Sequence, residues 1–450
     1  MFSSVTRVKY EVEETRVGQK TNYDKLTMEI WTNGTVTPEM ALVEAAKILR
    51  KHLNPFVGYT KPGPVVALPA AALFAVEAPL ESRLGMLVSD LRLSLRSNNC
   101  LEEAGIHAVV YEAAREIRAL GVGINLLPHA VRALSALGLA DRLATTGVAT
   151  TDLRYFTKRG EPIWSEPRGV DAGYRWPQYS IHRGELQMLL LEAVRTRLGH
   201  GRVVTGHRLT GFTQGPDGVE VHFTDRNNGD TPVTVHGDLL VGADGIHSVV
   251  RAHYYPDETE PVFSGRMLWR GITEAAPFLS GRTMIMAGHA NQKFVAYPIG
   301  AGTGGRVRIN WIAERQVGRG DDRVARDWNR VVDVETFLPH FAGWHFPWLD
   351  VPGLIEAAGT AYEFPMSDRD PVDRWSFRRV TLLGDAAHPM YPVGSNGASQ
   401  AILDAVALAT ALRGMAPGAD PVPALARYES TRLGPTAKIV LSNREQGPEA

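Results

Sequence analysis

Two acidic side chains stand at the ends of apolar runs that are typical of buried strands. Asp244 follows the run in DLLVGADG, and Asp385 follows the run 380–383 in RRVTLLGD. Open α/β sheets bind ligands at the carboxyl ends of their strands, where a carboxylate can accept a hydrogen bond from a hydroxyl group. A third acid, Glu112, ends the run 107–111, and in a dinucleotide-binding βαβ unit a carboxylate at this point holds a ribose. These acids predict a site for a hydroxylated, nucleotide-like cofactor.

A loop that enters a helix follows the second of these strands. Residues 392–397 (PVGSNG) run into an apolar helical pattern and include Gly394, Asn396 and Gly397. Backbone amides at the start of a helix attract negative charge. Upstream, Arg183 begins the helical pattern of YSIHRGELQM, from where it could reach a phosphate or a cofactor ring. On its own, Arg183 has the alternative of an ordinary surface residue.

Short elements must position these side chains. Gly121 and Gly123 in LGVGIN predict a tight loop, and the segment LRYFTKRGEPIWSEPRG predicts a β-hairpin with Arg159-Gly160 at its turn. A helical stripe after the tight loop consists of Val131, Leu134, Leu137 and Leu143. The aromatic run 337–350 (FLPHFAGWHFPWLD) is interpreted as core, since such clusters usually pack inside a protein.

Composition narrows the class of protein. The 450 residues have room for two or three domains, and 48 basic against 49 acidic residues give no global attraction to nucleic acid or to a membrane surface. The single cysteine, Cys100, excludes an internal disulfide framework and a cysteine-based zinc site, and no other grouping has metal-ligand spacing. No signal peptide or membrane-spanning run is recognised. We therefore expect a cytoplasmic α/β or α+β enzyme without a metal.

The first hundred residues have a different character. Residues 25–34 predict a strand and a turn, residues 37–52 an amphipathic helix, and residues 57–90 an Ala/Pro-rich linker. The stretch EETRVGQKTNYDKLTMEIWTNGTVTPEMALVEAAKILRKHLNPFV resembles the end of the assembly domain of bacterial RNA polymerase α subunits. LSLRSNNCLEEAGI resembles the first helix of that subunit's DNA-binding domain, in which Arg96 and Asn99 would touch DNA. The alternative for Arg96 and Asn99 is a solvated helix face, since one basic residue supplies little of the phosphate-contact energy that DNA binding requires. The resemblance lacks most of the assembly domain and the rest of the DNA-binding domain, so nucleic-acid and polymerase binding are not the expected functions.

A second resemblance covers nearly all of residues 105–445. Arg183, the ADG strand and GDAAHPMYPVGSNGASQAILD, in this order, resemble the FAD-dependent aromatic monooxygenases of the p-hydroxybenzoate hydroxylase type. The motifs LGVGIN, YSIHRGELQM, VGADGIHS and WRGIT are most similar to the 5-methylphenazine-1-carboxylate monooxygenases. The resemblance implies an α/β, Rossmann-type FAD domain of the glutathione-reductase kind with an antiparallel-sheet substrate domain. The FAD domain would consist of residues 106–147, 176–261 and 375–450, and the substrate domain of residues 148–175 and 262–374. Before them, residues 1–56 would form a strand-helix fragment, residues 57–90 a linker and residues 91–105 a helix.

The same resemblance implies roles for single residues. Glu112 would contact the adenosine ribose of FAD, Leu209 the adenine, and Asp385 the ribityl chain. Arg183 would contact the flavin or a phosphate. Further implied FAD-binding residues are Gly123 and Asp244, and those implied along the flavin edge are Gly394, Asn396 and Gly397. Trp269, Tyr297 and Pro389 are implied on the substrate side, with packing in the sheet domain as the alternative for each. No catalytic side chain is assigned: NAD(P)H would reduce the flavin, O2 would add at C4a, and the hydroperoxide would hydroxylate a phenazine- or salicylate-like ring.

The departure from this family lies before Glu112. A G-x-G-x-x-G turn is expected roughly 20 residues upstream, but residues 91–96 read LRLSLR. The Rossmann domain would then lack its first strand and the amides that hold pyrophosphate, and FAD affinity would fall severely unless residues 62–105 replace them. Three hypotheses stay open: an impaired or intact monooxygenase, a polymerase-associated or DNA-binding protein, and an inactive fusion. A homodimer also stays open.

Overall fold

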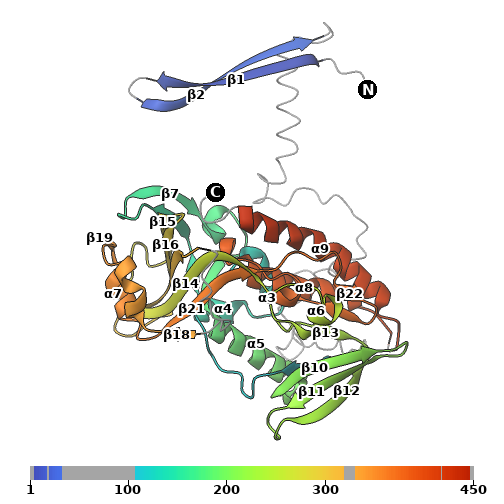
Figure 1. The fold of residues 1–450 in the computed structure, drawn as a ribbon. Helices are drawn as coiled ribbons and strands as arrows, with labels where there is room; N and C mark the ends of the chain where they lie inside the picture. The colour runs from blue at the N-terminus through green and yellow to red at the C-terminus, as the bar shows by residue number, and fades with distance from the viewer. Residues whose placement is uncertain (1–4, 18–19, 33–106, 319–329, 417, 446–450) are drawn as a thin grey trace, which may run out of the picture. The chain divides into compact units, whose positions relative to one another are not determined.

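The computed structural model describes residues 5–17, 20–32, 107–318, 330–416 and 418–445. The chain divides into two compact units, residues 1–77 and 78–450, and each is described by itself. The predicted helix 37–52, the linker 57–90 and the helix 91–105 lie outside the described residues. Figure 1 shows the described elements of both units.

The first unit contains an antiparallel hairpin of β1 (Val5–Val17) and β2 (Lys20–Thr32). The predicted strand within residues 25–34 is confirmed as the second half of β2, and the predicted turn at Asn33-Gly34 lies outside the described residues. Val8 lies opposite Ile30, and Tyr10 lies opposite Met28. Because side chains alternate along a strand, these four apolar residues share one face of the hairpin.

Two short parallel pairs form the part of the second unit where strand ends were predicted to bind a cofactor. β3 (Val110–Glu112) pairs with β9 (Val203–Thr205). β13 (Leu240–Gly242) pairs with β23 (Val380–Leu382), and β22 (Ser376–Phe377) adds an antiparallel edge. Within the described residues these are separate sheets, although Tyr111 and Val241 pack on one hydrophobic cluster. The predicted strands before Glu112, Asp244 and Asp385 are confirmed.

A large sheet forms the second layer. It has eight strands, parallel only between β6 (Asp152–Phe156) and β15 (Thr283–His289), so the predicted antiparallel sheet is mixed at this one pair. The predicted hairpin is confirmed as β6 and β7, with Gly160 at positive φ (81°) in its turn. The strands in spatial order are β18 (Arg330–Val332), β21 (Ala361–Asp368), β14 (Val262–Ala275), β17 (Val307–Gln316), β16 (Gln292–Ala301), β15 (Thr283–His289), β6 (Asp152–Phe156) and β7 (Pro162–Pro167).

One face of this sheet is covered by the aromatic run, as predicted. Phe337, Phe341, Trp344 and Phe346 are buried in one cluster with Trp311 of β17. The covering elements are η6 (Val334–Thr336), η7 (Leu338–His340), β19 (His345–Phe346), β20 (Leu349–Asp350) and α7 (Val351–Glu356). The aromatic run is therefore core, and the sheet's opposite face packs on separate buried clusters that include Tyr297 and Leu268.

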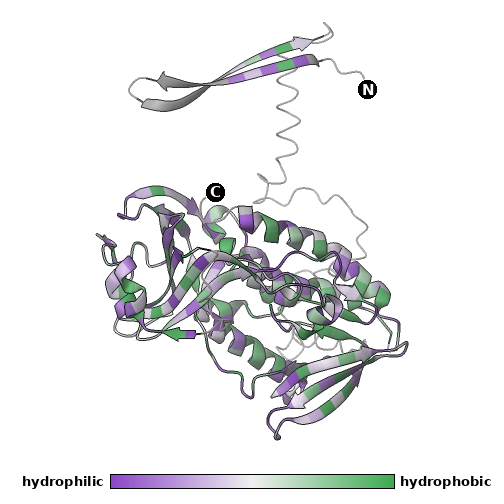
Figure 2. Cartoon of the chain, viewed as in Figure 1, coloured by the Kyte–Doolittle hydropathy of each residue, from purple (hydrophilic) through white to green (hydrophobic). Residues whose placement is uncertain are grey.

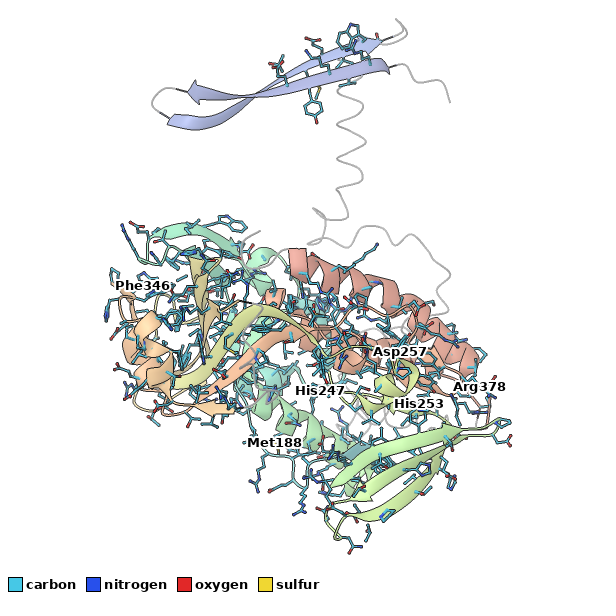
Figure 3. All side chains as sticks on the ribbon, viewed as in Figure 1. Met188, His247, His253, Asp257, Phe346 and Arg378 are labelled. Carbon is cyan, nitrogen blue, oxygen red and sulfur yellow. The ribbon has the colours of Figure 1, made fainter. Side chains whose placement is uncertain are left out.

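Two smaller sheets complete the second unit. β4 (Gly123–Leu126) and β5 (Val148–Thr150) flank β8 (Gln178–His182). β10 (His207–Gln214), β11 (Val219–Asp225) and β12 (Thr231–Gly237) form a meander in which apolar and polar residues alternate (Figure 2). His253 (labelled in Figure 3) packs on Phe212 of this meander. The ring centroids are 4.4 Å apart.

Helices pack between and beside these sheets. The prediction of a single helical stripe over residues 131–143 is wrong. The structure has two helices there, and Leu137, which lies between them, is 41% exposed. Gly138 breaks it because its φ of 70° is left-handed. The second unit also contains the α-helices α3 (Pro128–Ala136), α4 (Ala140–Thr146), α5 (Arg183–Leu198), α6 (Val249–Tyr254), α8 (Asn396–Leu412) and α9 (Val422–Glu445). Its other short 3₁₀ turns are η4 (Gly169–Ala172), η5 (His200–Arg202), η8 (Gly384–Ala386) and η9 (Val393–Ser395). In the part of the chain that the structure describes, no helix is long and apolar enough to cross a membrane.

Candidate cofactor and substrate site

Asp385 lies in the η8 turn directly after the buried strand β23. Its side chain is exposed, yet desolvation by the surrounding protein raises the pKa of its carboxyl. The charges of His388 and Arg183 act in the other direction, but desolvation has the larger effect. Within the described residues the Asp385 carboxylate accepts no hydrogen bond. An accessible carboxylate that is crowded by protein and has no internal partner is suited to accept a hydrogen bond from a ligand hydroxyl.

The loop before α8 presents backbone amides. Gly394 and Ser395 both have left-handed φ values, 66° and 59°, and Ser395 makes no side-chain cap to the helix. The first N–H groups of α8, which begins at Asn396, are therefore not capped by this side chain. Such an arrangement attracts negative charge. The predicted loop into a helix is confirmed, and Gly394, Asn396 and Gly397 lie together there.

Arg183 begins α5, as predicted, and its exposed guanidinium lies beside Gly121. A Cβ atom on Gly121, whose φ is 109°, would lie 2.8 Å from Arg183 Nη2. Arg183 also acts electrostatically on Asp385 and on Arg270. Arg183 and Asp385, far apart in the sequence, thus lie within electrostatic range of each other.

Gly123 is the first residue of β4, so the predicted tight loop ends before it. The large sheet holds both of its backbone groups. Asn310 Oδ1 accepts the Gly123 N–H at 2.7 Å, while Arg270 Nη2 and Tyr297 Oη donate to the Gly123 carbonyl at 2.7 and 2.9 Å. An added Cβ would lie 2.6 Å from Asn310 Cβ. Only glycine allows this close approach.

Trp269 and Arg270 point to opposite faces of β14. Trp269 stacks on Phe337, with centroids 4.9 Å apart, and its Nε1 donates to Glu363 at 2.9 Å. Its side chain therefore lies in the core on the covered face. Tyr297 is buried on the other face with Arg270. The structure does not bring the side chains of Trp269 and Tyr297 together.

The other predicted residues have separate surroundings. The Asp244 carboxylate accepts from Ser248 Oγ at 2.5 Å and from the Val249 N–H at 2.7 Å, so it caps α6. Glu112 accepts from the nearby Ala114 N–H at 2.7 Å. Leu209 lies in β10 and packs on the cluster that includes Tyr111. Pro389 is buried next to His388.

Comparison with known proteins decides the family. The sequence matches the family described as FAD binding domain over residues 95–443. This chain belongs to that family. It is similar to phenazine 1,6-dicarboxylic acid hydroxylase PhzS of Lysobacter antibioticus, with 49% identity over 341 residues, 75% of this chain and 83% of that protein. The enzyme HpxO of Klebsiella pneumoniae, solved with FAD and uric acid, has a TM-score of 0.63 at 27% identity, covering 78% of this chain and 84% of HpxO. The chain is thus an enzyme of the FAD-dependent monooxygenase class.

The N-terminal part of this FAD-family chain has a separate relationship. Residues 4–53 match the RNA polymerase Rpb3/Rpb11 dimerisation domain. A segment of 110 residues is 61% identical to the RNA polymerase α subunit of Rhodopirellula baltica, and covers 33% of that subunit. The resemblance of residues 1–105 to fragments of that subunit is confirmed.

Two buried groups that support the Asp385 turn were missed in the sequence. Arg251 donates to the carbonyls of Ala386 and Ala387 at 3.3 and 2.8 Å and pairs with Glu258 at 2.6 Å. Asp404, in α8, accepts from the Gly384 N–H at 3.1 Å. The motif VGADGIHSVVR contains Arg251 and could have indicated it, whereas nothing local marks Asp404. No cluster of potential metal ligands occurs in the described ranges.

The packing of α5 in this FAD-family fold gives a testable prediction. A Cβ on Gly184 would lie 2.3 Å from the Ala119 carbonyl carbon and 2.5 Å from the Leu120 nitrogen, both backbone atoms that cannot rotate away. We expect Gly184→Ala to lower the free energy of unfolding by about 1–3 kcal/mol, as overpacking does. Urea denaturation measures it. Gly201→Ala is the control, since nothing lies within 4 Å of its Cβ; equal losses in both variants would contradict the predicted close contact.

Proposed function

We propose that the chain is an NAD(P)H-using, FAD-dependent monooxygenase that hydroxylates a phenazine- or salicylate-like aromatic substrate with O2. The observation that carries this proposal is Asp385: an accessible carboxylate that accepts no hydrogen bond from the described residues, within electrostatic range of Arg183 and at the end of a buried strand. The substrate class is supported by the relative PhzS, whose name specifies a phenazine dicarboxylic acid.

The residues present fit FAD at several points. Asp385 would accept a ribityl hydroxyl, and the amides near Gly397 would face the flavin ring edge. Arg183 would reach the flavin or a phosphate. Glu112, at the end of β3, would hold the adenosine ribose, with Leu209 near adenine. Because LRLSLR stands where the family has its glycine turn, we expect weaker pyrophosphate binding than in relatives that have that turn.

FAD, when bound, supplies the transfer of electrons from NAD(P)H to O2 and the oxygen transfer to the aromatic ring. The protein positions the reacting groups and keeps water away. Leu268, Met366 and Tyr391 form a buried apolar cluster that joins the face of the large sheet opposite the aromatic run to the segment before α8. Such a wall would limit the escape of reactive oxygen as hydrogen peroxide. Amides at the start of α8 would stabilise negative charge on the ring.

The test is a coupled assay on the FAD-loaded full chain. Phenazine-1-carboxylate or salicylate should stimulate NAD(P)H oxidation and yield a product that contains one atom of ¹⁸O from ¹⁸O2. Hydrogen peroxide should account for a minor share of the electrons. Oxidation without any labelled product, across both substrate types, would overturn the proposed hydroxylation.

A further inference from the structure

Ser395 has an unfavourable backbone conformation at the start of α8. Its φ of 59° and ψ of 32° are left-handed. A residue with a Cβ atom adopts this form about 5- to 30-fold less readily than the ordinary helical form, whereas glycine, as at Gly394, adopts it freely. A residue keeps such a conformation only where its surroundings hold it. Some contact must therefore hold Ser395 and, with it, the direction of the amides that follow.

Asn125 of β4 supplies that contact. Its Nδ2 donates to Ser395 Oγ at 3.3 Å, across 270 positions of the sequence, and also faces Met284 Sδ at 3.8 Å. Among the described residues, no other side chain bonds the Ser395 hydroxyl. One turn further along α8, Ser399 Oγ accepts the Leu127 N–H at 3.1 Å. The segment that contains β4 thus holds the start of α8 at two points, and Asn125 acts at the left-handed residue.

A buried polar chain fixes the Asn125 side chain in turn. Ser180 lies directly opposite Asn125 on β8, and its Oγ donates to Asn125 Oδ1 at 2.5 Å. Thr150 Oγ1 lies 2.7 Å from Ser180 Oγ. Because Asn125 Oδ1 accepts from Ser180, the donating Nδ2 is the group that faces Ser395. All three polar residues are buried, and apolar residues of the same shape would serve the sheet about as well, so the chain indicates a role beyond folding.

We propose that Asn125 is a positioning residue that holds Ser395 in its left-handed form and so keeps the first amides of α8 directed at the flavin. This inference rests on the proposed function, in which these amides meet the flavin edge. Amides held in this way stabilise negative charge on the reduced ring, which raises its midpoint potential. They also strengthen FAD binding, because the loop is ordered before the cofactor arrives.

The experiment removes either partner of the Asn125–Ser395 contact in the full chain. Asn125→Leu and Ser395→Ala should each raise the Kd for FAD about 2- to 12-fold, the value of one neutral hydrogen bond. Both should shift the flavin midpoint potential to a more negative value. In the FAD-free chain, both should speed hydrogen exchange of the amides in residues 395–399 by a similar factor. The double variant should be no worse than either single one, since the two residues share one contact.

Two further variants separate positioning from general support. Thr150→Val keeps the shape and removes a hydrogen bond at the far end of the same buried chain. It should leave the FAD Kd, the potential and the exchange of residues 395–399 unchanged, whatever it does to stability. Ser395→Gly adopts the left-handed form without help. In that background, Asn125→Leu should change the Kd by less than about twofold, the usual error of additivity.

Two results would overturn the inference. One is an equal effect of Thr150→Val and Asn125→Leu on the Kd and the potential, and the other is a full effect of Asn125→Leu in the Ser395→Gly background. A wild-type chain that takes up no FAD would instead defeat the proposed function. Hydrogen exchange in the FAD-free chain then still decides the role of Asn125: unchanged exchange of residues 395–399 in Asn125→Leu would show that it does not hold Ser395.

Discussion

Replacement of Asp404 by alanine is expected to lower the free energy of unfolding by about 3–5 kcal/mol, the cost of removing one partner of a buried ion pair. Asp404 is fully buried. Its Oδ2 accepts from His388 Nε2 at 2.5 Å and the Gly384 N–H at 3.1 Å, and its Oδ1 accepts from Arg432 Nε at 2.7 Å. Alanine would leave Arg432 buried without its counter-charge and would free the turn that carries Asp385.

Urea denaturation of the full chain measures this effect. Asp238→Ala is the matched control, because Asp238 is exposed and its side chain makes no contact that the described residues show. The control should stay within about 0.5 kcal/mol of the wild type, as exposed substitutions do. If Asp404→Ala lowers the free energy of unfolding no more than Asp238→Ala does, the contacts of Asp404 with His388, Gly384 and Arg432 do not stabilise the fold.

Asp385→Asn should have opposite effects on cofactor binding and on the free protein. On the proposed role of Asp385 as acceptor of a ribityl hydroxyl, loss of its charge should raise the Kd for FAD about 10- to 100-fold. Protein without FAD should become slightly more stable, by less than about 1 kcal/mol because the group is exposed. The reason is that desolvation raises the pKa of Asp385 in the folded state.

The sign of the pH dependence follows from that shift. A carboxyl whose folded pKa lies above its unfolded value costs stability once pH exceeds the unfolded pKa. The gain from Asp385→Asn should therefore be present at pH 7 and vanish below about pH 4, near the unfolded value. Thermal unfolding at the two pH values and FAD titration at pH 7 check both effects. If Asp385→Asn binds FAD as tightly as the wild type does, Asp385 is not part of the FAD site.

Elements around the site could be predicted where local pattern and burial agree. The strands before Glu112 and Asp385 and the helix that begins at Arg183 are examples. The break at Gly138 was missed because the stripe of leucines on both sides keeps helical spacing. Tertiary packing, rather than periodicity, decided that Leu137 is exposed.

Side-chain direction and long-range partners could not be predicted. β14 is buried on both faces, so its sequence does not tell whether Trp269 or Arg270 faces a ligand. The partners of Asp404 come from two segments, residues 384–388 and α9, and Arg270 donates to the Gly123 carbonyl, 147 positions away in the sequence. Such contacts depend on the assembled layers and leave no local signal in the sequence.

The most direct test of the central claim is titration of the purified full chain with FAD, followed by flavin fluorescence and absorbance. The account predicts saturable binding of one FAD per chain, with a perturbed flavin spectrum and weakened binding in Asp385→Asn. A folded chain that takes up no FAD at concentrations well above those that saturate its relatives would contradict it.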